Sequence, residues 1–326
     1  MSAPERVAVV GAGLAGLAAA RRLQTAGAEV VVFEKARGAG GRTSTRRGDG
    51  GAFDHGAQYF TCRTPRFSTQ LESWLERGVA ERWEGTIVAL GASSAVSKLE
   101  DAVRYVGMPR MSMLARDLAS ELRLETGARV VAAHSRAGGW ALSFESRDDA
   151  VGFDTLVVAT PAPQAVPLLA AVPALAERAG SVSMQPCHAA MVRFTEAPGL
   201  GFDGAFVADA ALGWVARNAS KPGRDAQECW VLHSTPEWSA RHLEASPDEI
   251  AQVLLEALAN QVGKRLPPTS WSATHRWLLA RTAAPLAMPA PWDPGSRVGL
   301  CGDWIRGSRV EDAFLCGDEL GEAILA

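Results

Sequence analysis

The chain has 326 residues, of which 47% are hydrophobic, and its 33 lysines and arginines face 36 aspartates and glutamates. This length predicts two domains or one large α/β unit with an insertion, and the composition is that of a folded globular chain. The net charge of -3 gives no support for a broad basic surface, so we expect neither nucleic acid nor a membrane as partner. A small-molecule ligand is the better expectation.

The sequence carries no signature of a membrane span, a targeting segment or a metal site. No apolar run reaches the roughly 18 residues that a transmembrane helix needs. The start of the chain lacks an Arg-rich amphipathic pattern, which predicts a cytoplasmic protein. The five cysteines are scattered and form no C-x-x-C pair, so we expect free thiols and no bound metal.

The first predicted elements are a strand, a glycine-rich turn, a helix and a second strand. Residues 6–10 form a short apolar run that leads directly into G-A-G-L-A-G at 11–16. Good helix formers follow up to Gly27, and a second apolar run at 30–33 ends at Glu34. A G-x-G-x-x-G in this context is typical of a dinucleotide-binding unit.

Each position of this motif has a mechanical role. Gly11 permits the tight turn, Gly13 lets a pyrophosphate approach the backbone, and Gly16 lets the helix pack closely on the strand. The phosphates then lie at the helix N-terminus. Glu34 is placed to accept hydrogen bonds from ribose hydroxyls and would repel a 2′-phosphate, which favours FAD or NAD over NADP.

Two further segments favour FAD over NAD. Residues 35–42 form a second glycine-rich, basic stretch in which Arg42 is suited to pair with a phosphate oxygen. Near the end, 297–301 predicts a buried strand that leads to Gly302-Asp303, and the turn 307–309 precedes a helical pattern beginning at Val310. This second strand–turn–helix is available for another part of the same cofactor.

Between these segments the chain predicts helices, a hairpin and a tryptophan-rich region. The predicted elements are helices over 67–75 and 111–122, a hairpin of 129–133 with 140–144, a buried strand over 153–159 and a Ser246-capped helix over 250–258. Tryptophans gather between 161 and 279, at Trp214, Trp230, Trp238, Trp271 and Trp277. Core packing and an aromatic wall around a planar substrate both remain open for them.

The motifs together resemble a known family. E-K-x-R-G-x-G-G-R at 34–42, D-H-G-A-Q-Y-F at 54–60, V-V-A-T-P-A-P-Q at 157–164 and C-G-D-W at 301–304 accompany the first glycine motif. This set resembles the flavin-containing amine-oxidase superfamily. W-x-A-R-N-x-S-K-P at 214–222, H-R-W-L-x-A-R at 275–281 and S-R-V-E at 308–311 are more similar to its bacterial renalase branch.

The resemblance implies an α/β fold in which a two-dinucleotide-binding, Rossmann-type FAD domain carries a mixed-sheet substrate domain. The FAD domain would be discontinuous, with segments 1–61, 109–160 and 280–326, and the substrate domain would comprise 62–108 and 161–279. FAD would be held noncovalently. The implied cofactor-binding residues are Gly11, Gly13, Leu14, Gly16, Glu34, Lys35, Arg42, Gly56, Ala57, Val130, Asp303 and Val310.

For the substrate we expect Gln58, Tyr59, Phe60, His233 and Arg309. Gln58 offers a donor and an acceptor to a carboxamide, Tyr59 is able to stack on a flat ring, and Arg309 adds a fixed positive charge. The resemblance implies oxidation of 2- or 6-dihydro isomers of NAD(P), with a hydride passing to FAD and then to O2 as hydrogen peroxide. Such a reaction needs geometry and stacking rather than a catalytic base, and we assign none.

Two alternatives stay open. One is an amine oxidase or a desaturase of a hydrophobic substrate, although none of the four lysines is placed as the flavin-N5 lysine of amine oxidases. The other is a non-enzymatic binding protein like the GDP-dissociation inhibitors, which resemble the same superfamily. A monomer is the expected oligomeric state. His134, His242 and His275 are expected to be structural.

Overall fold

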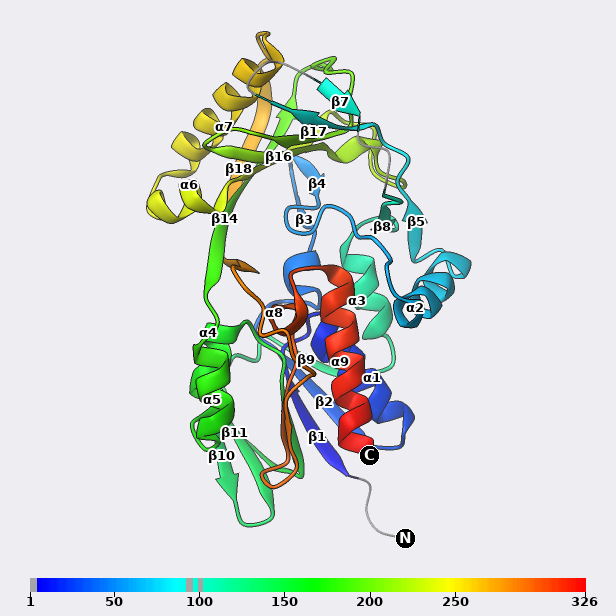
Figure 1. The fold of residues 1–326 in the computed structure, drawn as a ribbon, viewed down its shortest axis with the longest axis vertical. Helices are drawn as coiled ribbons and strands as arrows, with labels where there is room; N and C mark the ends of the chain where they lie inside the picture. The colour runs from blue at the N-terminus through cyan, green and yellow to red at the C-terminus, as the bar shows by residue number, and fades with distance from the viewer. Residues whose placement is uncertain (1–4, 92–95, 99–101) are drawn as a thin grey trace.

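The computed structural model describes residues 5–91, 96–98 and 102–326. Residues 1–4 of the predicted segment 1–61, and 92–95 and 99–101 of the predicted segment 62–108, lie outside the described residues. The chain folds around two large sheets, one low and one high in the view of Figure 1. Within the described residues, no helix is long and apolar enough to cross a membrane.

The first sheet has six strands and is built from apolar runs covered on both faces. All its neighbours are parallel except the pair at one edge, where β19 runs against β20. In spatial order the strands are β19 (Trp292–Asp293), β20 (Val298–Leu300), β13 (Thr155–Val158), β1 (Arg6–Val10), β2 (Glu29–Glu34) and β9 (Arg123–Thr126). The predicted strands 6–10, 30–33, 153–159 and 297–301 are confirmed as β1, β2, β13 and β20.

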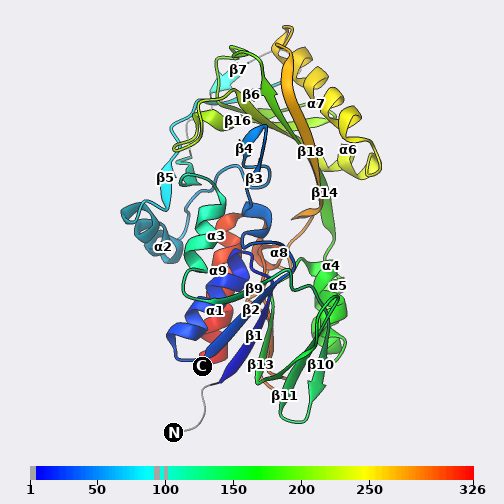
Figure 2. The ribbon, with the colours of Figure 1, turned by 180° about the vertical axis from the view of Figure 1, so that it is seen from behind.

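Helices cover one face of this sheet and a small antiparallel sheet covers the other (Figures 1 and 2). The helices are α1 (Leu14–Thr25), α3 (Ser112–Leu118), α8 (Asp303–Arg306) and α9 (Val310–Leu325). The small sheet contains β10 (Val130–Arg136), β11 (Gly139–Phe144) and β12 (Ala150–Phe153). Phe33 of β2 packs against Phe144 and Phe153, with ring centroids 5.2 and 5.8 Å apart, which fixes this sheet on the strands.

The second sheet has seven strands and is antiparallel apart from the β15–β6 pair. In spatial order it contains β18 (Thr269–Thr282), β14 (Met184–Phe194), β17 (Cys229–Ser234), β16 (Leu212–Arg217), β15 (Gly204–Val207), β6 (Ile87–Leu90) and β7 (Val96–Lys98). The helices α6 (Pro236–Arg241) and α7 (Pro247–Val262) cover its outer face. The predicted cap is confirmed, because the Ser246 side chain accepts a hydrogen bond from the Glu249 backbone N–H.

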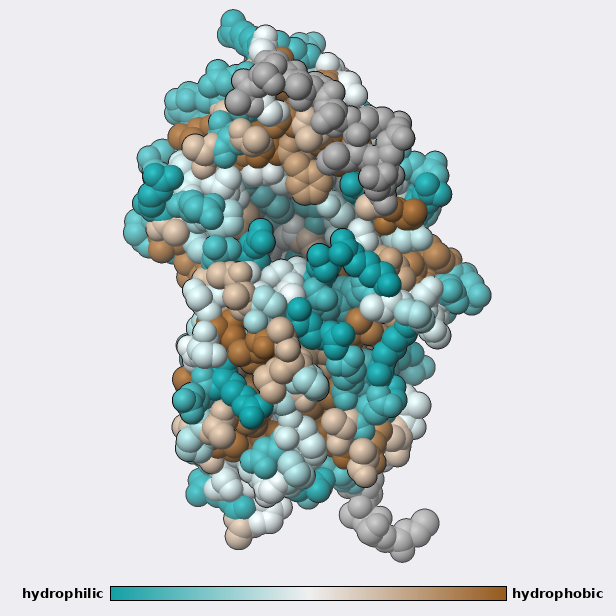
Figure 3. Space-filling model, in the orientation of Figure 1, coloured by the Kyte–Doolittle hydropathy of each residue, from teal (hydrophilic) through white to brown (hydrophobic). Residues whose placement is uncertain are grey.

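Shorter elements connect the two sheets. They are β3 (Arg46–Gly48), β4 (Gly51–Phe53), α2 (Pro65–Glu76), β5 (Ala80–Arg82), β8 (Tyr105–Gly107), α4 (Ala162–Ala165) and α5 (Pro173–Gly180), with the 3-10 turns η1 (Gly41–Thr43), η2 (Val166–Leu169) and η3 (Asn218–Ser220). The long strands β14 and β18 reach from the second sheet down to the first (Figure 2). The face drawn in Figure 3 is hollowed at the height where the two parts meet.

The structure corrects the prediction at three places. The helix predicted over 111–122 ends at Leu118, because the chain turns there and enters β9. Neither β9 nor β12 was predicted from the sequence. Both are short, and Val151 of β12 is 65% exposed, so these strands lack the continuous apolar run that marked the central ones.

Candidate functional site

A cavity of about 1200 Å³ lies between the two sheets. Its walls include the carboxyl ends of β1, β2 and β13, the N-terminus of α9, and β16, β17 and β18 of the second sheet. Ligands of doubly wound α/β folds bind at this end of the parallel strands. The volume exceeds the roughly 300 to 1,000 Å³ of ordinary small-molecule pockets, which suits a dinucleotide together with a second molecule.

The glycine turn after β1 forms one end of the cavity. Gly11 has a φ of 109°, which an L side chain adopts only with strain. A Cβ on Gly16 would lie 2.1 Å from the Gly11 carbonyl oxygen and 2.9 Å from the Ala159 Cβ, so helix α1 approaches the strands as closely as predicted. The helix has no side-chain cap at Gly13, which leaves its first N–H groups for an anion.

Glu34 is held at the end of β2 by backbone groups. One carboxylate oxygen accepts the Ala12 N–H at 2.9 Å and the other accepts the Ala36 N–H at 2.8 Å. The carboxylate lines the cavity while the residue is 7% exposed. Each oxygen keeps a second acceptor position, which is what two ribose hydroxyls require.

Arg42 and Asp303 form a bidentate ion pair beside this end of the cavity. The Arg42 guanidinium donates to the two carboxylate oxygens at 2.9 and 2.6 Å and to the Ala280 carbonyl at 3.0 Å. The structure therefore brings the basic glycine-rich segment and the C-terminal Gly302-Asp303 turn together, as the sequence predicted. The partner of Arg42 in the structure is thus a carboxylate, whereas the sequence predicted a phosphate oxygen.

The loop 54–59 forms the floor of the cavity and rests directly on the backbone of Arg42. A Cβ on Gly56 would lie 2.0 Å from the Arg42 carbonyl oxygen, and the Ala57 N–H donates to that same oxygen at 2.9 Å. Gln58 lines the cavity, but its amide is engaged inside the protein. Its Oε1 accepts from Lys221 at 3.1 Å, and its Nε2 donates to the carbonyls of Asp54 and Gly56. Gln58 thus lacks the free amide that we expected for a substrate carboxamide.

Aromatic side chains form the wall above this floor. Tyr59 packs against Trp214 with ring centroids 5.5 Å apart, and Phe206 packs against Trp214 at 4.7 Å. All three line the cavity, as does Trp277. The tryptophans therefore divide into two groups, because Trp214 and Trp277 line the cavity whereas Trp230 and Trp238 lie in the core behind the second sheet.

Phe60 corrects our expectation of a substrate-binding residue. It is 3% exposed and does not line the cavity. Its ring packs among Phe67, Trp74 and Tyr105, with centroids 5.8 to 6.1 Å apart. Alternation along the extended segment explains the difference, because Tyr59 points to the cavity and the next side chain points away.

Three histidines lie next to the aromatic wall, and burial lowers the pKa of each of them. Burial lowers the pKa of His233 to about 4, and its Nε2 lies 3.0 Å from the His55 carbonyl oxygen. Burial, followed by the nearby His275 and His233, lowers the pKa of His55 to about 3. Burial also lowers the pKa of His275, which packs on Trp277 at 4.3 Å. His233 and His275 line the cavity.

The cavity has a strongly basic lining. Its basic residues are Lys35, Arg42, Arg129, Arg276, Arg281 and Arg309. Its acidic residues are Glu34 and Asp303, both of which already have partners. Arg281 and Arg309 lie on adjoining segments, because the Thr282 N–H donates to Ser308 Oγ at 3.1 Å.

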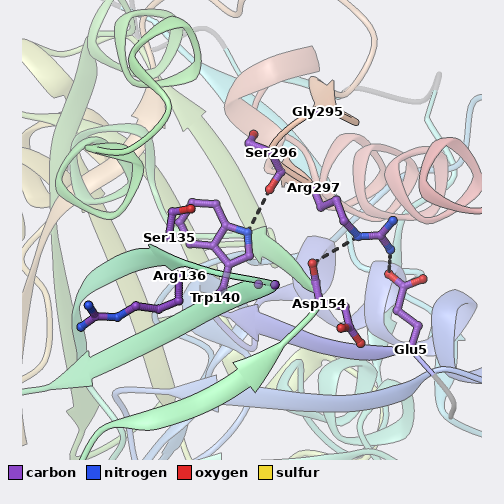
Figure 4. Close-up of a pocket in the computed structure, with 10 residues that line it drawn as sticks. Glu5, Ser135, Arg136, Trp140, Asp154, Gly295, Ser296 and Arg297 are labelled. Carbon is purple, nitrogen blue, oxygen red and sulfur yellow. Dashed lines mark hydrogen bonds and ion pairs between the residues drawn. The ribbon is translucent and has the colours of Figure 1, made fainter.

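A second hollow of about 620 Å³ lies at the opposite, amino end of the parallel strands (Figure 4). Its polar groups are largely paired with one another. Arg297 forms an ion pair with Glu5 and donates to the Asp154 carbonyl, and the Trp140 indole donates to the Ser296 carbonyl. We therefore place the functional site in the larger cavity.

Most of the predicted residues meet at this cavity. Besides those described above, Leu14, Lys35, Val130 and Val310 line it. Sequence reasoning did not identify Phe206, Cys187, Arg129 or Arg281 as lining residues. It also missed the buried cluster of Asp54, Lys221 and Arg224 behind the floor, although Asp54 and Lys221 stand inside the motifs that carried the family resemblance.

Comparison with known proteins defines the family. Residues 65–325 match the model of the flavin containing amine oxidoreductases, and residues 9–77 match that of an NAD(P)-binding Rossmann-like domain. The chain therefore belongs to the flavin containing amine oxidoreductase family. It is a flavin-dependent oxidoreductase, and its cofactor is FAD.

Solved structures show the same fold over the whole chain. A putative protoporphyrinogen oxidase from Exiguobacterium sp. 255-15 is 14% identical with a TM-score of 0.77, and the alignment covers 99% of both chains. Cyclohexylamine oxidase from Brevibacterium oxydans IH-35A is 14% identical with a TM-score of 0.78 and the same coverage.

A sequence match to a curated relative covers a short segment. The 4,4'-diapophytoene desaturase of Staphylococcus aureus (strain Newman) is 49% identical over 51 residues, which are only 10% of its own length and 16% of this chain.

The residues present fit FAD. The close approach at Gly16, the uncapped start of α1 and the Glu34 carboxylate provide what a pyrophosphate and a ribose require. Glu34, Lys35 and Val130 would surround the adenosine, and Arg42, Gly56 and Asp303 would lie further along the cofactor. The N-terminus of α9 at Val310 lines the cavity and would offer a positive helix end to the flavin.

Proposed function

We propose that this protein is a renalase-like oxidase of misreduced nicotinamide dinucleotides. Its substrates would be 2- or 6-dihydro-NAD(P), and the products NAD(P)+ and hydrogen peroxide. Each turnover removes one hydride from the dihydronicotinamide ring, and O2 takes up this hydride and one proton. Bound FAD supplies the two-electron acceptor.

The observation that carries the proposal is the charge of the cavity. Six basic residues and two acidic ones line the cavity, in a chain with a net charge of -3. Arg42 pairs with Asp303, and Arg129 and Arg276 pair with Glu145 and Glu244 outside the lining, whereas Arg281 and Arg309 form no ion pair with another described residue. These two arginines favour a second anionic ligand besides the pyrophosphate of FAD, and a dinucleotide carries its own pyrophosphate. Arg281 and Arg309 are the residues that we assign to it.

The same lining disfavours a simple amine. A protonated amine is a cation, and both acidic residues of the lining are already engaged, Glu34 by backbone N–H groups and Asp303 by Arg42. Lys35 is the single lysine among the described lining residues, and it donates to Gln164. Lysine chemistry at the flavin is therefore not part of our proposal.

Stacking and exclusion of water are the tasks that we assign to the chain's own residues. Tyr59, Trp214 and Trp277 offer flat surfaces for a dihydronicotinamide ring. Because the ring gains aromaticity when the hydride leaves, no protein base is required. We assign His233 and His275, whose pKa values burial lowers, to hydrogen bonding rather than to proton transfer. Burial raises the pKa of the Cys187 thiol to about 11, which disfavours a thiolate bond to the flavin, and FAD is noncovalent in our proposal. We expect the enzyme to act as a monomer.

Anaerobic stopped-flow mixing tests the proposal. The purified holoenzyme is mixed separately with 2-dihydro-NAD, 6-dihydro-NAD, ordinary NADH, putrescine and cyclohexylamine. The visible absorbance of the oxidised flavin is followed in each case. We expect rapid bleaching by a 2- or 6-dihydro isomer, with equal amounts of NAD+ and hydrogen peroxide formed in air. Bleaching by the amines alone would instead establish the amine-oxidase alternative.

A further inference from the structure

Behind the floor of the cavity lies a buried charged cluster that the proposed reaction does not use. Lys221 follows η3, and its side chain is 0% exposed. Its Nζ lies 3.1 Å from Gln58 Oε1, 3.4 Å from Asn218 Oδ1 and 3.6 Å from Asp54 Oδ2. Lys221 does not line the cavity, so it does not contact a molecule bound there.

Asp54 does not need Lys221 as its counter-charge. The Arg224 guanidinium donates to Asp54 Oδ2 through Nη2 at 2.6 Å and through Nε at 3.2 Å, and its side chain is 2% exposed. Thr45 and the Met111 N–H occupy the other carboxylate oxygen. A second buried cation costs desolvation energy that Asp54 alone does not offset. Lys221 also contacts Asn218 and the Trp83 ring, but its contact with Gln58 is the one that reaches the floor of the cavity.

An ammonium group only donates hydrogen bonds, so it accepts only one orientation of the Gln58 amide. With Oε1 turned toward Lys221, Nε2 is turned toward the carbonyls of Asp54 and Gly56. These bonds tie the two ends of the loop 54–58 to one side chain. The neighbouring Ala57 and Tyr59 line the cavity, so the shape of the floor depends on this arrangement.

We propose that Lys221 is a positioning residue that locks the Gln58 amide and thereby holds the loop 54–59 in the form that shapes the flavin cavity. The loop comes from the N-terminal part of the chain, while Lys221 comes from the connection between β16 and β17. The second sheet thus sets the geometry of a segment that belongs to the cofactor-binding half. This inference concerns the cavity floor and does not depend on which substrate is oxidised.

A double-mutant cycle on the holoenzyme tests the proposal. The variants are Lys221→Met, Gln58→Met and the double variant, with Lys264→Met as the matched control because Lys264 lies on the surface and donates to the Gly199 carbonyl. The visible circular dichroism of bound FAD reports the floor without any substrate. The rate of flavin reduction by 6-dihydro-NAD provides a second readout.

We expect each single variant at position 221 or 58 to change the circular dichroism and to slow reduction about tenfold, the size of one lost hydrogen bond to a charged group. The double variant should lose no more than either single variant, because both remove the same contact. Lys264→Met should match the unmodified enzyme. Additive losses, or a Lys221→Met enzyme that matches the Lys264→Met control, would overturn the proposal.

A pH series separates positioning from a merely structural role. Burial lowers the pKa of Lys221 to about 8, against the opposing effect of Asp54. The other charged or titratable groups near it are Arg224, which keeps its charge, and His233, whose pKa of about 4 lies far below. The circular dichroism should therefore change near pH 8 in the unmodified enzyme and not in Lys221→Met. If Lys221→Met does not fold, the loss of this transition in Gln58→Met decides the question, and its persistence there overturns the proposal.

If neither 2-dihydro-NAD nor 6-dihydro-NAD reduces the unmodified holoenzyme, the proposed function fails alone. The circular dichroism and its pH series still test the role of Lys221.

Discussion

Arg42 and Asp303 are 261 residues apart in the chain and share two hydrogen bonds of 2.9 and 2.6 Å. The pair joins the basic glycine-rich segment to the first residue of α8, and it lines the cavity that we assign to FAD. The side chain of Asp303 is only 7% exposed. Removal of Arg42 would therefore leave a buried carboxylate without its hydrogen-bond donors, which lowers the free energy of unfolding.

Asp303→Asn should weaken FAD binding. The amide removes one negative charge and directs an N–H group toward the guanidinium, so we expect the dissociation constant of FAD to rise at least about tenfold. Flavin fluorescence after gel filtration measures the loss. Glu84→Gln is the control, since Glu84 forms a surface pair with Arg82. Full FAD retention by Asp303→Asn would show that the ion pair does not hold this region in place.

Gly16→Ala should lose both stability and cofactor. The added Cβ would lie 2.1 Å from the Gly11 carbonyl oxygen, a contact that the turn relieves only by moving. We expect the free energy of unfolding to fall by about 2 kcal/mol or more, as for other overpacked sites. Gly38→Ala, where an added Cβ meets nothing within 4 Å, is the matched control in the same denaturation experiment. Equal stability of the two variants would contradict the close packing of α1.

Arg281→Gln and Arg309→Gln should each raise KM for an anionic substrate. If these residues contact the substrate pyrophosphate, KM for 6-dihydro-NAD should rise about tenfold and its dependence on salt should weaken. The uncharged dihydronicotinamide riboside should be affected far less. Arg82→Gln is the control, because Arg82 has a side chain 61% exposed and lies outside the cavity. An equal loss with both substrates would point to a general disturbance of the site.

Acid should destabilise the protein through its buried histidines. The pKa values of His233 and His55 fall to about 4 and about 3 in the folded state, from 6.5 when unfolded. Between these values the unfolded chain binds more protons, so stability is complete above pH 6.5 and is lost as the pH falls toward 4. Urea unfolding at several pH values measures how the free energy of unfolding depends on pH. This dependence should be weaker for His233→Gln than for the unmodified protein. The substitution His134→Gln, at an exposed position, should leave the pH dependence of the free energy of unfolding unchanged.

The central strands and the two glycine-containing turns that line the cavity were predictable because each depends on local sequence. An apolar run next to G-A-G-L-A-G specifies a buried strand and a tight turn wherever the rest of the chain lies. The position of Glu34 follows from the length of β2, and the start of α9 follows from the turn before Val310. These features needed no knowledge of distant contacts.

The floor and wall of the cavity were harder to predict because they depend on contacts between distant segments. Nothing in the local sequence around Lys221 shows that it is buried or that it bonds to Gln58, 163 residues away. Phe60 was misplaced for a similar reason, since adjacent aromatic residues give no local sign of which one faces the core. The basic lining likewise arises from arginines on four separate segments.

The cofactor cavity has walls from both the beginning and the end of the chain. Helices α1 and α9 lie side by side, and α8 and α9 follow the last strand of the first sheet (Figure 1). A polypeptide still emerging from the ribosome consequently has a nucleotide turn at Gly11 long before the opposing wall at Asp303 exists. The complete cavity requires both segments, so we expect the vitamin-derived ligand to be held only after translation has passed Asp303, when the first sheet is complete, rather than to guide early folding.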